Sequence, residues 1–392
     1  MAIDPFTVNE TSYSRYGGAT TQMPRFDNTN ATYSYTAAPG SPRYSDVAGE
    51  RPWYDPRDWS LRKKLIVAAC IVVVIIAVVV GAVEGVKANA YPNYSRLSYN
   101  PVDVYSGASF FDNFEYFTGY DPTKGFVHYV DSAAANQLNL THASDTTAVL
   151  RVDTAADNQT TGRRSVRITS HKKYDHGLFI FDVVHSPYGC STWPALWLTD
   201  PSNWPDNGEI DVVESNNKGT HGNSMTLHTT KNCKMDVKRK QSGSTQQKDC
   251  LYTANANAGC GVEGPKSSYG EDFNKNGGGV YAMELRDAGI RMWMFPRDKI
   301  PSDISSNSSS PDPSKWGEAA SDFPSTHCNI GSHFRNQSIV ANIDICGEMA
   351  GSSKFYTDMY SCPTTCSQFA AEMGGNFTDA YWEFNSFKVY QA

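Results

Sequence analysis

The chain has 392 residues, a formal net charge of −7 at pH 7, and an aromatic content of 12%. Its length suggests two or three domains, although all-β sandwiches of more than about 200 residues commonly form one unit. The charge balance is acidic and no basic stripe is interleaved with aromatics, so nucleic acid is not an expected partner. The 8 Trp and 22 Tyr residues suit a surface that stacks sugar rings, but equally a large β core.

The N-terminal part of the chain divides into two segments of different character. Residues 1–60 are rich in Tyr, Ser, Thr, Pro, Asn and Arg and show no helix or strand periodicity, so we expect a disordered tail. Residues 65–83 read LIVAACIVVVIIAVVVGAV, without a charge. This run is close to the roughly 20 residues that cross a bilayer as a helix, and it is too long and too far along the chain for an ordinary signal peptide.

The charges that flank the apolar run predict its orientation. Arg57, Arg62, Lys63 and Lys64 precede it, whereas Lys87 is the basic residue that closely follows it. The positive-inside rule therefore keeps the tail in the cytoplasm and translocates the rest. We predict a single-pass type II membrane protein, with residues 84–99 as a short stalk and the main domain outside the cell or in the secretory lumen.

Cysteines and glycosylation sequons agree with this topology. Eight of the nine Cys follow the apolar run, and an even number there predicts disulfides in an oxidising compartment, with the pairing left open. The segment Cys362-Pro-Thr-Thr-Cys366 also allows a metal site, but no second pair with zinc-like spacing accompanies it. Asn-x-Ser/Thr sequons begin on the translocated side at Asn93, Asn139, Asn158, Asn307, Asn336 and Asn376. Two more, at Asn9 and Asn30, lie in the predicted cytosolic tail.

From about residue 100 the pattern changes to short strands separated by turn residues. We expect strands at 165–170, 177–185, 224–229, 277–285, 290–295, 338–345 and 380–390, with a hairpin turn at 286–289. Helical patterning is scarce and no internal repeat is found. The predicted fold class is therefore all-β, a sandwich of antiparallel sheets that spans residues 100–392.

One strand-like stretch, NGEIDVVES at 207–215, carries three carboxylates within six residues. Burying like charges this close together costs several kcal/mol without partners, so such a cluster usually serves chemistry or a metal. Alternation along a strand would point Glu209 and Asp211 one way and Glu214 the other. If all three share one cleft, the strand must contain a β-bulge around Val212 and Val213.

With the bulge, the two glutamates can flank a bond at a separation of about 5 to 5.5 Å, as in a retaining glycosidase. Two other interpretations of the stretch remain open. It can form a solvent-exposed acidic strand edge, or a Ca²⁺ site built from oxygen ligands.

Aromatic residues surround the acidic strand in sequence. Trp193, Trp197 and Trp204 precede it, and His228 lies on the next expected strand. In an extended segment, Trp193 and Trp197 cannot both share the face of Leu196, so at least one is available to a cleft. Core tryptophans and a structural histidine are the alternative interpretation.

Three motifs together resemble a known family. Trp193-Pro-Ala-Leu-Trp197, Gly208-Glu-Ile-Asp-Val-Val-Glu214 and Leu227-His228-Thr229 are similar to the fungal laminarinase branch of glycoside hydrolase family 16, the endo-β-1,3(4)-glucanases. The resemblance covers nearly all of residues 100–391. It implies a β-jelly-roll sandwich with a long concave glycan cleft and a β-glucan substrate. We expect no cofactor and no catalytic metal, a structural Ca²⁺ is not indicated, and we expect a monomer.

The resemblance also implies roles for individual residues. Glu209 would be the nucleophile, and Glu214 would be the general acid and then the base, which requires a raised pKa at Glu214 and an ionised Glu209. Asp211 would hydrogen-bond Glu209 and repel charge on Glu214. Contacts to glucose units would come from Trp193, Trp197, Trp204 and His228.

The sequence departs from the family pattern at two places. Ser215-Asn216-Asn217 stands where Gly-Val-Asn is common, and Met349 stands where many fungal relatives have a Trp. A Met packs on a sugar without a flat π surface, which affects one subsite and thus linkage preference. Two alternatives to a hydrolase are a cell-wall glucan transglycosylase and a non-catalytic β-glucan-binding protein.

Overall fold

A computed structural model of the chain describes residues 54–156, 158–306 and 310–392. Most of the predicted tail lies outside these ranges. The chain separates into two compact units, 1–70 and 71–392, with the division inside helix α1, Leu61–Asn89. Before α1, the described part of the first unit forms one 3-10 turn, η1, Pro56–Asp58.

Helix α1 contains the whole predicted apolar run and extends beyond it at both ends. Its residues 61–86 form a span long and apolar enough to cross a membrane, and none of the side chains in this span is buried. The predicted stalk therefore begins as helix, because helical hydrogen bonding continues past Val83 to Asn89.

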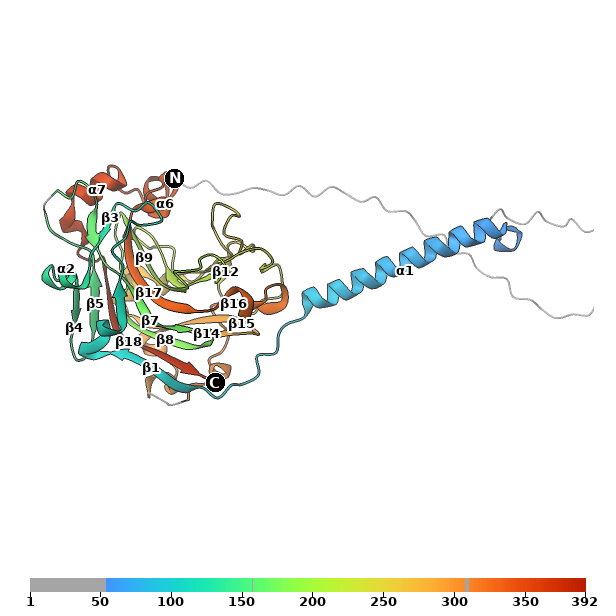
Figure 1. Ribbon diagram of the computed structural model, residues 1–392, viewed down its shortest axis with the longest axis horizontal. Helices are drawn as coiled ribbons and strands as arrows, with labels where there is room; N and C mark the ends of the chain where they lie inside the picture. The colour runs from blue at the N-terminus through green and yellow to red at the C-terminus, as the bar shows by residue number, and fades with distance from the viewer. Residues whose placement is uncertain (1–53, 157, 307–309) are drawn as a thin grey trace, which may run out of the picture. The chain divides into compact units, whose positions relative to one another are not determined.

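The second unit contains two eight-stranded sheets packed face to face (Figure 1). The β8 sheet has the order β16-β15-β14-β8-β18-β5-β4, with β1 paired to β18. Its strands are β1 Asn100–Ser106, β4 Thr141–Ala143, β5 Ala148–Arg151, β8 Gly177–His185, β14 Gly279–Arg286, β15 Gly289–Pro296, β16 Ser321–Pro324 and β18 Tyr381–Gln391.

The β10 sheet has the order β12-β13-β11-β10-β9-β17-β7-β2. Its strands are β2 Phe114–Tyr116, β7 Arg167–Tyr174, β9 Thr192–Thr199, β10 Glu209–Glu214, β11 Ser224–His228, β12 Ser244–Thr245, β13 Val262–Glu263 and β17 Gln337–Ile345. Strands β3 Val127–Tyr129 and β6 Arg163–Ser165 form a separate parallel pair. The short helices are α2 Ser132–Gln137, α3 Gly270–Lys275, α4 Ser302–Ser305, α5 Ile330–His333, α6 Gly347–Ala350 and α7 Cys366–Glu372.

These elements confirm the predicted all-β antiparallel sandwich. Strand β8 has the predicted bounds, and β14 pairs with β15 so that Arg286 faces Gly289 across a two-residue turn. Strand β8 is largely apolar because both of its faces are covered. Phe179 and Phe181 join the core between the sheets, whereas Leu178 and Ile180 pack in a second cluster on the outer face.

The core between the sheets is rich in aromatic residues. Trp382 on β18 is fully buried, and its Nε1 donates to the Asn342 carbonyl of β17 at 3.1 Å, which links the two sheets. Phe384 and Phe387 on the same strand are also fully buried. Full burial of one such side chain contributes about 1.5 to 3 kcal/mol, so this strand secures the sandwich that carries the β10 sheet.

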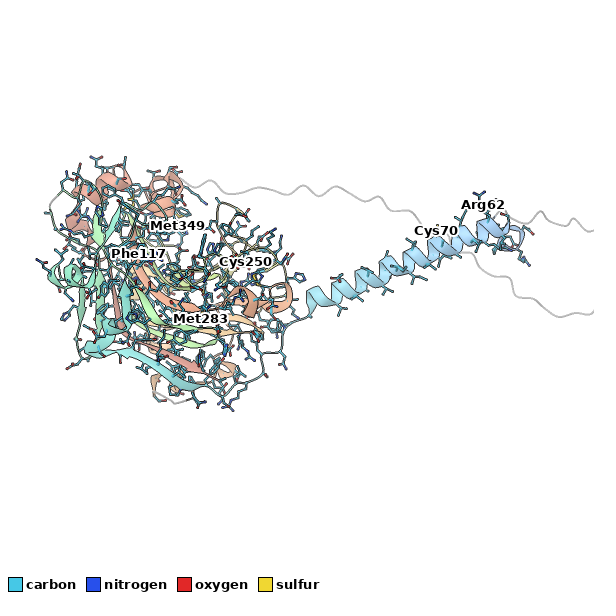
Figure 2. All side chains as sticks on the ribbon, in the orientation of Figure 1. Arg62, Cys70, Phe117, Cys250, Met283 and Met349 are labelled. Atoms are coloured by element: carbon cyan, nitrogen blue, oxygen red, sulfur yellow. A yellow bond between two sulfur atoms is a disulfide. The ribbon has the colours of Figure 1, made fainter. Side chains whose placement is uncertain are left out.

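Four disulfides confirm that the eight cysteines that follow α1 pair with one another. Cys250, labelled in Figure 2, forms the disulfide with the smallest sequence separation, 10 residues. The pairs are Cys190–Cys362, Cys233–Cys328, Cys250–Cys260 and Cys346–Cys366. Cys362 and Cys366 bind different partners, so the metal-site interpretation of their segment is wrong. The remaining cysteine, Cys70, is a free thiol within α1.

Residues 90–99, expected to belong to a stalk, instead pack on the outer face of the β8 sheet. We call them the N-terminal strap. Tyr91 and Tyr94 donate their hydroxyls to the two carboxylate oxygens of Asp322, at 3.1 and 3.2 Å. Tyr99 is buried and donates to Glu284 at 2.9 Å. The strap therefore belongs to the folded domain, because phenol side chains satisfy carboxylates that the sheet buries.

The strap yields a prediction about stability. Replacing both Tyr91 and Tyr94 by Phe keeps the rings but removes two donors from Asp322, which is fully buried. We expect the free energy of unfolding to fall by about 1 to 3 kcal/mol, measured by denaturant unfolding with tryptophan fluorescence. Tyr120→Phe is the control, because Tyr120 is 99% exposed. Equal stability of the two variants would contradict the docked strap.

Candidate active site

The acidic strand β10 lies between β9 and β11, and its register slips against both neighbours. Asp211 and Glu214 pair with Thr226 and Ser224 of β11, so two residues of β10 face one residue of its partner. The pairing with β9 also shifts after Asp211. This irregularity confirms the predicted β-bulge at 212–213.

The bulge separates apolar from acidic side chains. Val212 and Val213 are adjacent in sequence, yet both are buried in the core between the sheets. Placing two consecutive residues on one face shifts the alternation by one, so Glu214 returns to the side of Glu209 and Asp211. The mutual effect of these carboxylates on their pKa values, described below, agrees with this placement.

Two of the three predicted tryptophans hydrogen-bond the glutamates directly. Trp193 Nε1 donates to Glu214 Oε1 at 2.8 Å, and Trp204 Nε1 donates to Glu209 Oε2 at 2.7 Å. Trp204 is 41% exposed, so its ring is open to solvent beside the acid. Each indole thus orients one carboxylate and also presents an aromatic surface.

Trp197 occupies a different position from the other two. Its Nε1 donates to Asn342 Oδ1 at 2.8 Å, and the guanidinium of Arg167 lies 4.9 Å from its ring centroid. The ring is half-buried. No described hydrogen bond joins Trp197 to the three acids, but the strand register places it opposite Asp211, four residues along β9 from Trp193.

Trp204 is held by a loop built on a buried carboxylate. Asp200 Oδ2 accepts from the side-chain amides of Asn203 and Asn207, both at 2.8 Å, and Oδ1 lies 3.0 Å from Lys173 Nζ. Burial would raise the pKa of Asp200, but these hydrogen bonds outweigh it and lower the pKa to about 2. The ionised carboxylate therefore fixes the loop that carries Trp204.

His228 contacts a carboxylate. Its Nε2 lies 3.4 Å from Asp211 Oδ2, and its Nδ1 lies 3.0 Å from Asn257 Oδ1. The expectation that Asp211 hydrogen-bonds Glu209 is not met among the described contacts. His228 is the register partner of Glu209 on β11. Its ring reaches the diagonal neighbour Asp211.

Burial and neighbouring charge set the protonation of the acids. Burial, with the Asp211 charge second, raises the pKa of Glu214 to about 7. Burial, with Glu209 second, raises the pKa of Asp211 to about 6. Burial also raises the pKa of Glu209. The His228 charge and the hydrogen bond from Trp204 oppose this shift, whereas the Glu214 charge adds to it. The raised pKa predicted for Glu214 is thus present, but Glu209 is not left unperturbed.

His228 supplies the compensating positive charge. Burial lowers its pKa, but the hydrogen bond to Asp211 and the charges of Glu209, Asp211 and Glu214 raise it to about 10. A protonated His228 in turn lowers the pKa of each acid. The protonation states of these four titratable groups therefore depend on one another, and a change at any one will shift the pKa values of the others.

The same cluster contains a geometric candidate for metal binding. One ligand atom each from Glu209, Asp211 and His228 lie within 4.8 Å of one another. Two of these groups also form an ion pair with each other, since His228 Nε2 lies 3.4 Å from Asp211 Oδ2. The absence of a metal from the reaction remains a prediction.

A second pair of acids, the buried Asp344 and the half-buried Asp121, lies beside Trp193. Asp344 on β17 faces Trp193 on β9. Thr123 Oγ1 lies 2.9 Å from Asp344 Oδ2 and 2.5 Å from Asp121 Oδ2. Burial, with the Asp121 charge second, raises the pKa of Asp344 to about 8. A protonated Asp344 can therefore donate to Thr123, which donates to Asp121, and this chain ties the loop at 121–125 to β17.

The two departures from the family pattern meet in space. Met349 of α6 is half-buried, and its Sδ lies 3.3 Å from Asn216 Nδ2 (Figure 2). Asn217 Nδ2 donates to the Ala350 carbonyl at 3.1 Å. The residues after the bulge are thus hydrogen-bonded to the segment that carries Met349.

Known proteins are similar in sequence to this domain. Residues 114–390 match the family model described as XgeA-like, catalytic GH16 domain. The probable glycosidase C21B10.07 of Schizosaccharomyces pombe is 45% identical over 305 residues, which cover 77% of this chain and 71% of that protein. The endo-1,3(4)-beta-glucanase of Arthroderma benhamiae is 40% identical over 296 residues, which cover 74% and 64%, so this chain spans less than two thirds of that relative.

Two solved structures have a similar fold at comparable identity. Laminarinase 16A from Phanerochaete chrysosporium, solved with 6-O-glucosyl-laminaritriose in donor and acceptor sites, has a TM-score of 0.73 at 41% identity and covers 75% of this chain and 100% of that one. An elongating GH family 16 β-1,3-glucosyltransferase has a TM-score of 0.70 at 41% identity with the same coverage. With the family model extending over most of the sandwich, the chain belongs to glycoside hydrolase family 16, in its XgeA-like group.

Proposed function

We propose that the protein is a retaining endo-β-glucanase that hydrolyses β-1,3-glucan or mixed β-1,3/1,4-glucan. The observation that carries the proposal is the bulge, which brings Glu209 and Glu214 to one side of β10. Each of these carboxylates is held by its own indole. The names of the curated relatives support the substrate class.

The reaction would proceed in two displacements. The Glu209 carboxylate attacks the anomeric carbon, and the glycosidic C–O bond breaks as Glu214 gives its proton to the leaving oxygen. Ionised Glu214 then takes a proton from water, whose oxygen attacks the same carbon and releases Glu209. The two steps use Glu214 first as an acid and then as a base, for which a pKa of about 7 is well matched.

Asp211 and His228 would act on the two glutamates without touching the bond that breaks. The Asp211 charge helps to keep Glu214 protonated, and His228 favours the ionised form of Glu209. Trp193 and Trp204 would border the glucosyl units on either side of the cleaved bond, with Trp197 opposite Asp211 on β9. The proposed site uses the residues predicted from the sequence, but the contact of Asp211 is His228 and not Glu209.

Transfer of the glycosyl unit to another glycan is the second candidate. The bulged acidic strand favours the hydrolase, but a glucosyltransferase at 41% identity supports transfer as well. Both reactions form the same glycosyl-enzyme and differ in whether water or a sugar hydroxyl resolves it. A non-catalytic glucan-binding protein is less favoured, because both glutamates are retained.

Digestion of defined glucans tests the proposal. The purified chain is incubated with laminarin, lichenan, barley β-glucan and cellulose, and new reducing ends are measured with and without a labelled laminaritetraose acceptor. We expect reducing ends from the glucans that contain β-1,3 bonds and little label in longer products. Label that accumulates in longer chains would favour transfer, and binding without new reducing ends would favour the non-catalytic protein.

We further propose that α1 anchors the domain as a type II membrane protein. The five sequon asparagines in the described residues, Asn93, Asn139, Asn158, Asn336 and Asn376, are all exposed, as glycan attachment requires. Asn307 lies outside the described residues. Treatment of the cell-derived protein with an N-glycan amidase should lower its apparent mass, and an unchanged mass would argue against translocation.

A further inference from the structure

The bulge leaves backbone polar groups without a regular partner strand. Between the pairs Asp211 with Thr226 and Glu214 with Ser224, the ladder to β11 is interrupted. The interruption is buried, since Val212 and Val213 are at most 1% exposed. Buried N–H and C=O groups must find partners, or each costs about 1 to 3 kcal/mol.

One side chain supplies both partners. Asn223, just before β11, donates its Nδ2 to the Val212 carbonyl at 2.9 Å and accepts the Glu214 N–H on its Oδ1 at 3.0 Å. Asn223 itself is 1% exposed. Its carboxamide therefore takes the place of the peptide group that a regular strand would present, and it binds the chain on both sides of Val213.

Asn223 is in turn fixed by its own backbone. Its N–H donates to Ser268 Oγ at 2.8 Å, and its carbonyl accepts from the Gly264 N–H at 2.8 Å. The preceding Gly222 has a φ of 106°, and a Cβ there would lie 2.6 Å from the Pro265 carbonyl oxygen. The chain can approach the 264–268 turn this closely because residue 222 has no side chain.

We infer that Asn223 is a positioning residue for Glu214. It fixes the backbone N–H of Glu214 and so orients the carboxylate toward Trp193 Nε1. This inference rests on the proposed function, in which Glu214 protonates the leaving oxygen. Asn223 does not touch the reacting atoms, and its effect passes through the geometry of the bulge.

The other edge of β10 keeps the strand in place when Asn223 is changed. Glu214 remains paired with Ala195 of β9, and the Ser215 N–H donates to the Pro194 carbonyl. Loss of the carboxamide should therefore disturb the orientation of the Glu214 side chain without unfolding the sheet.

The test compares two substrates with different leaving groups. Laminarin needs a proton on its leaving oxygen, whereas a 2,4-dinitrophenyl β-laminaribioside does not, so kcat/KM for the aryl substrate is insensitive to the acid. In the full chain, we expect Asn223→Ala to lower kcat/KM for laminarin by about 10- to 100-fold and that for the aryl substrate by less than about 3-fold. Glu214→Gln should show the same pattern with a larger ratio.

Two further variants keep the inference falsifiable. Ser268→Ala loosens the anchor of Asn223 and should give a smaller shift in the same direction, which covers the case in which Asn223→Ala does not fold. Asn385→Ala is the control, since it removes a carboxamide that donates to Asp182 in the other sheet, and it should leave the ratio unchanged. Equal losses on both substrates, or a change in melting temperature alone, would overturn the inference. If the unaltered chain cleaves neither substrate, the proposed function fails instead.

Discussion

Glu209→Gln is expected to lower kcat/KM by at least about 10⁴-fold on laminarin and on the dinitrophenyl laminaribioside alike, because the nucleophile serves every substrate. Glu214→Gln is expected to lower kcat/KM on laminarin by about 10²- to 10⁴-fold and to spare the aryl substrate. The amides preserve side-chain shape, so the indoles of Trp204 and Trp193 can still donate to the remaining oxygens. The measurement is initial-rate kinetics on both substrates.

Glu115→Gln provides the matched control for these variants. Glu115 is an exposed residue on β2, at the far edge of the same sheet from the β11 side of the bulge. Its substitution should leave both rates unchanged. If either Glu209→Gln or Glu214→Gln retained full hydrolysis of glucan, the assignment of the two-carboxylate mechanism would be wrong.

Asp211→Asn is expected to move the alkaline limb of the pH profile toward lower pH. Glu214 must be protonated to act as the acid, so kcat/KM of the unaltered chain should fall as pH rises through about 7. The Asp211 charge raises the pKa of Glu214, and its removal lowers that pKa. A shift of about one unit corresponds to about 1.4 kcal/mol, so activity at pH 8 should fall about tenfold further in the variant.

The expected sign follows from which form is active. A general acid is lost above its pKa, so a lower pKa removes activity at lower pH. Burial, the largest cause of the raised pKa of Glu214, is unchanged by the substitution, so the limb should move but not disappear. A profile of kcat/KM against pH on laminarin measures the shift. A limb that stays in place or moves to higher pH would show that Asp211 does not tune Glu214.

Sequence patterns predicted the elements whose signals are local. Period-two alternation and apolar runs located β8, β14, β15, β17 and β18. The bulge was also predictable, because three acids at spacings of two and three cannot share a strand face without an extra residue. These inferences needed only the geometry of one strand.

Features that depend on distant segments could not be predicted in this way. Asn223 is an ordinary polar residue in sequence, and its role arises from the register between β10 and β11. The His228 contact with Asp211 depends on the same register. The donor role of Trp204 depends on a loop that is organised by Asp200. The available sequence signal was an Asn placed just before the strand expected to follow the bulged one.

The boundary of the domain was missed for a similar reason. Residues 90–99 have no strand alternation, so their pattern resembled a linker. Their partners, Asp322 and Glu284, lie more than 180 residues away in sequence. Three tyrosines within nine residues are the local feature that could have indicated a docked segment, since buried phenols require acceptors.

The N-terminal strap also determines where a mechanical load enters the domain. Tension along the chain from its N-terminal side meets Tyr91, Tyr94 and Tyr99 before it reaches the first residue of β1. These side chains hold the strap flat against β14 and β16, two strands far along in sequence. The load would thus be shared with the interior of the β8 sheet and would not peel β1 from β18 first. Resistance to such pulling is governed by the unfolding rate, so the strap would prolong the lifetime of the domain under force.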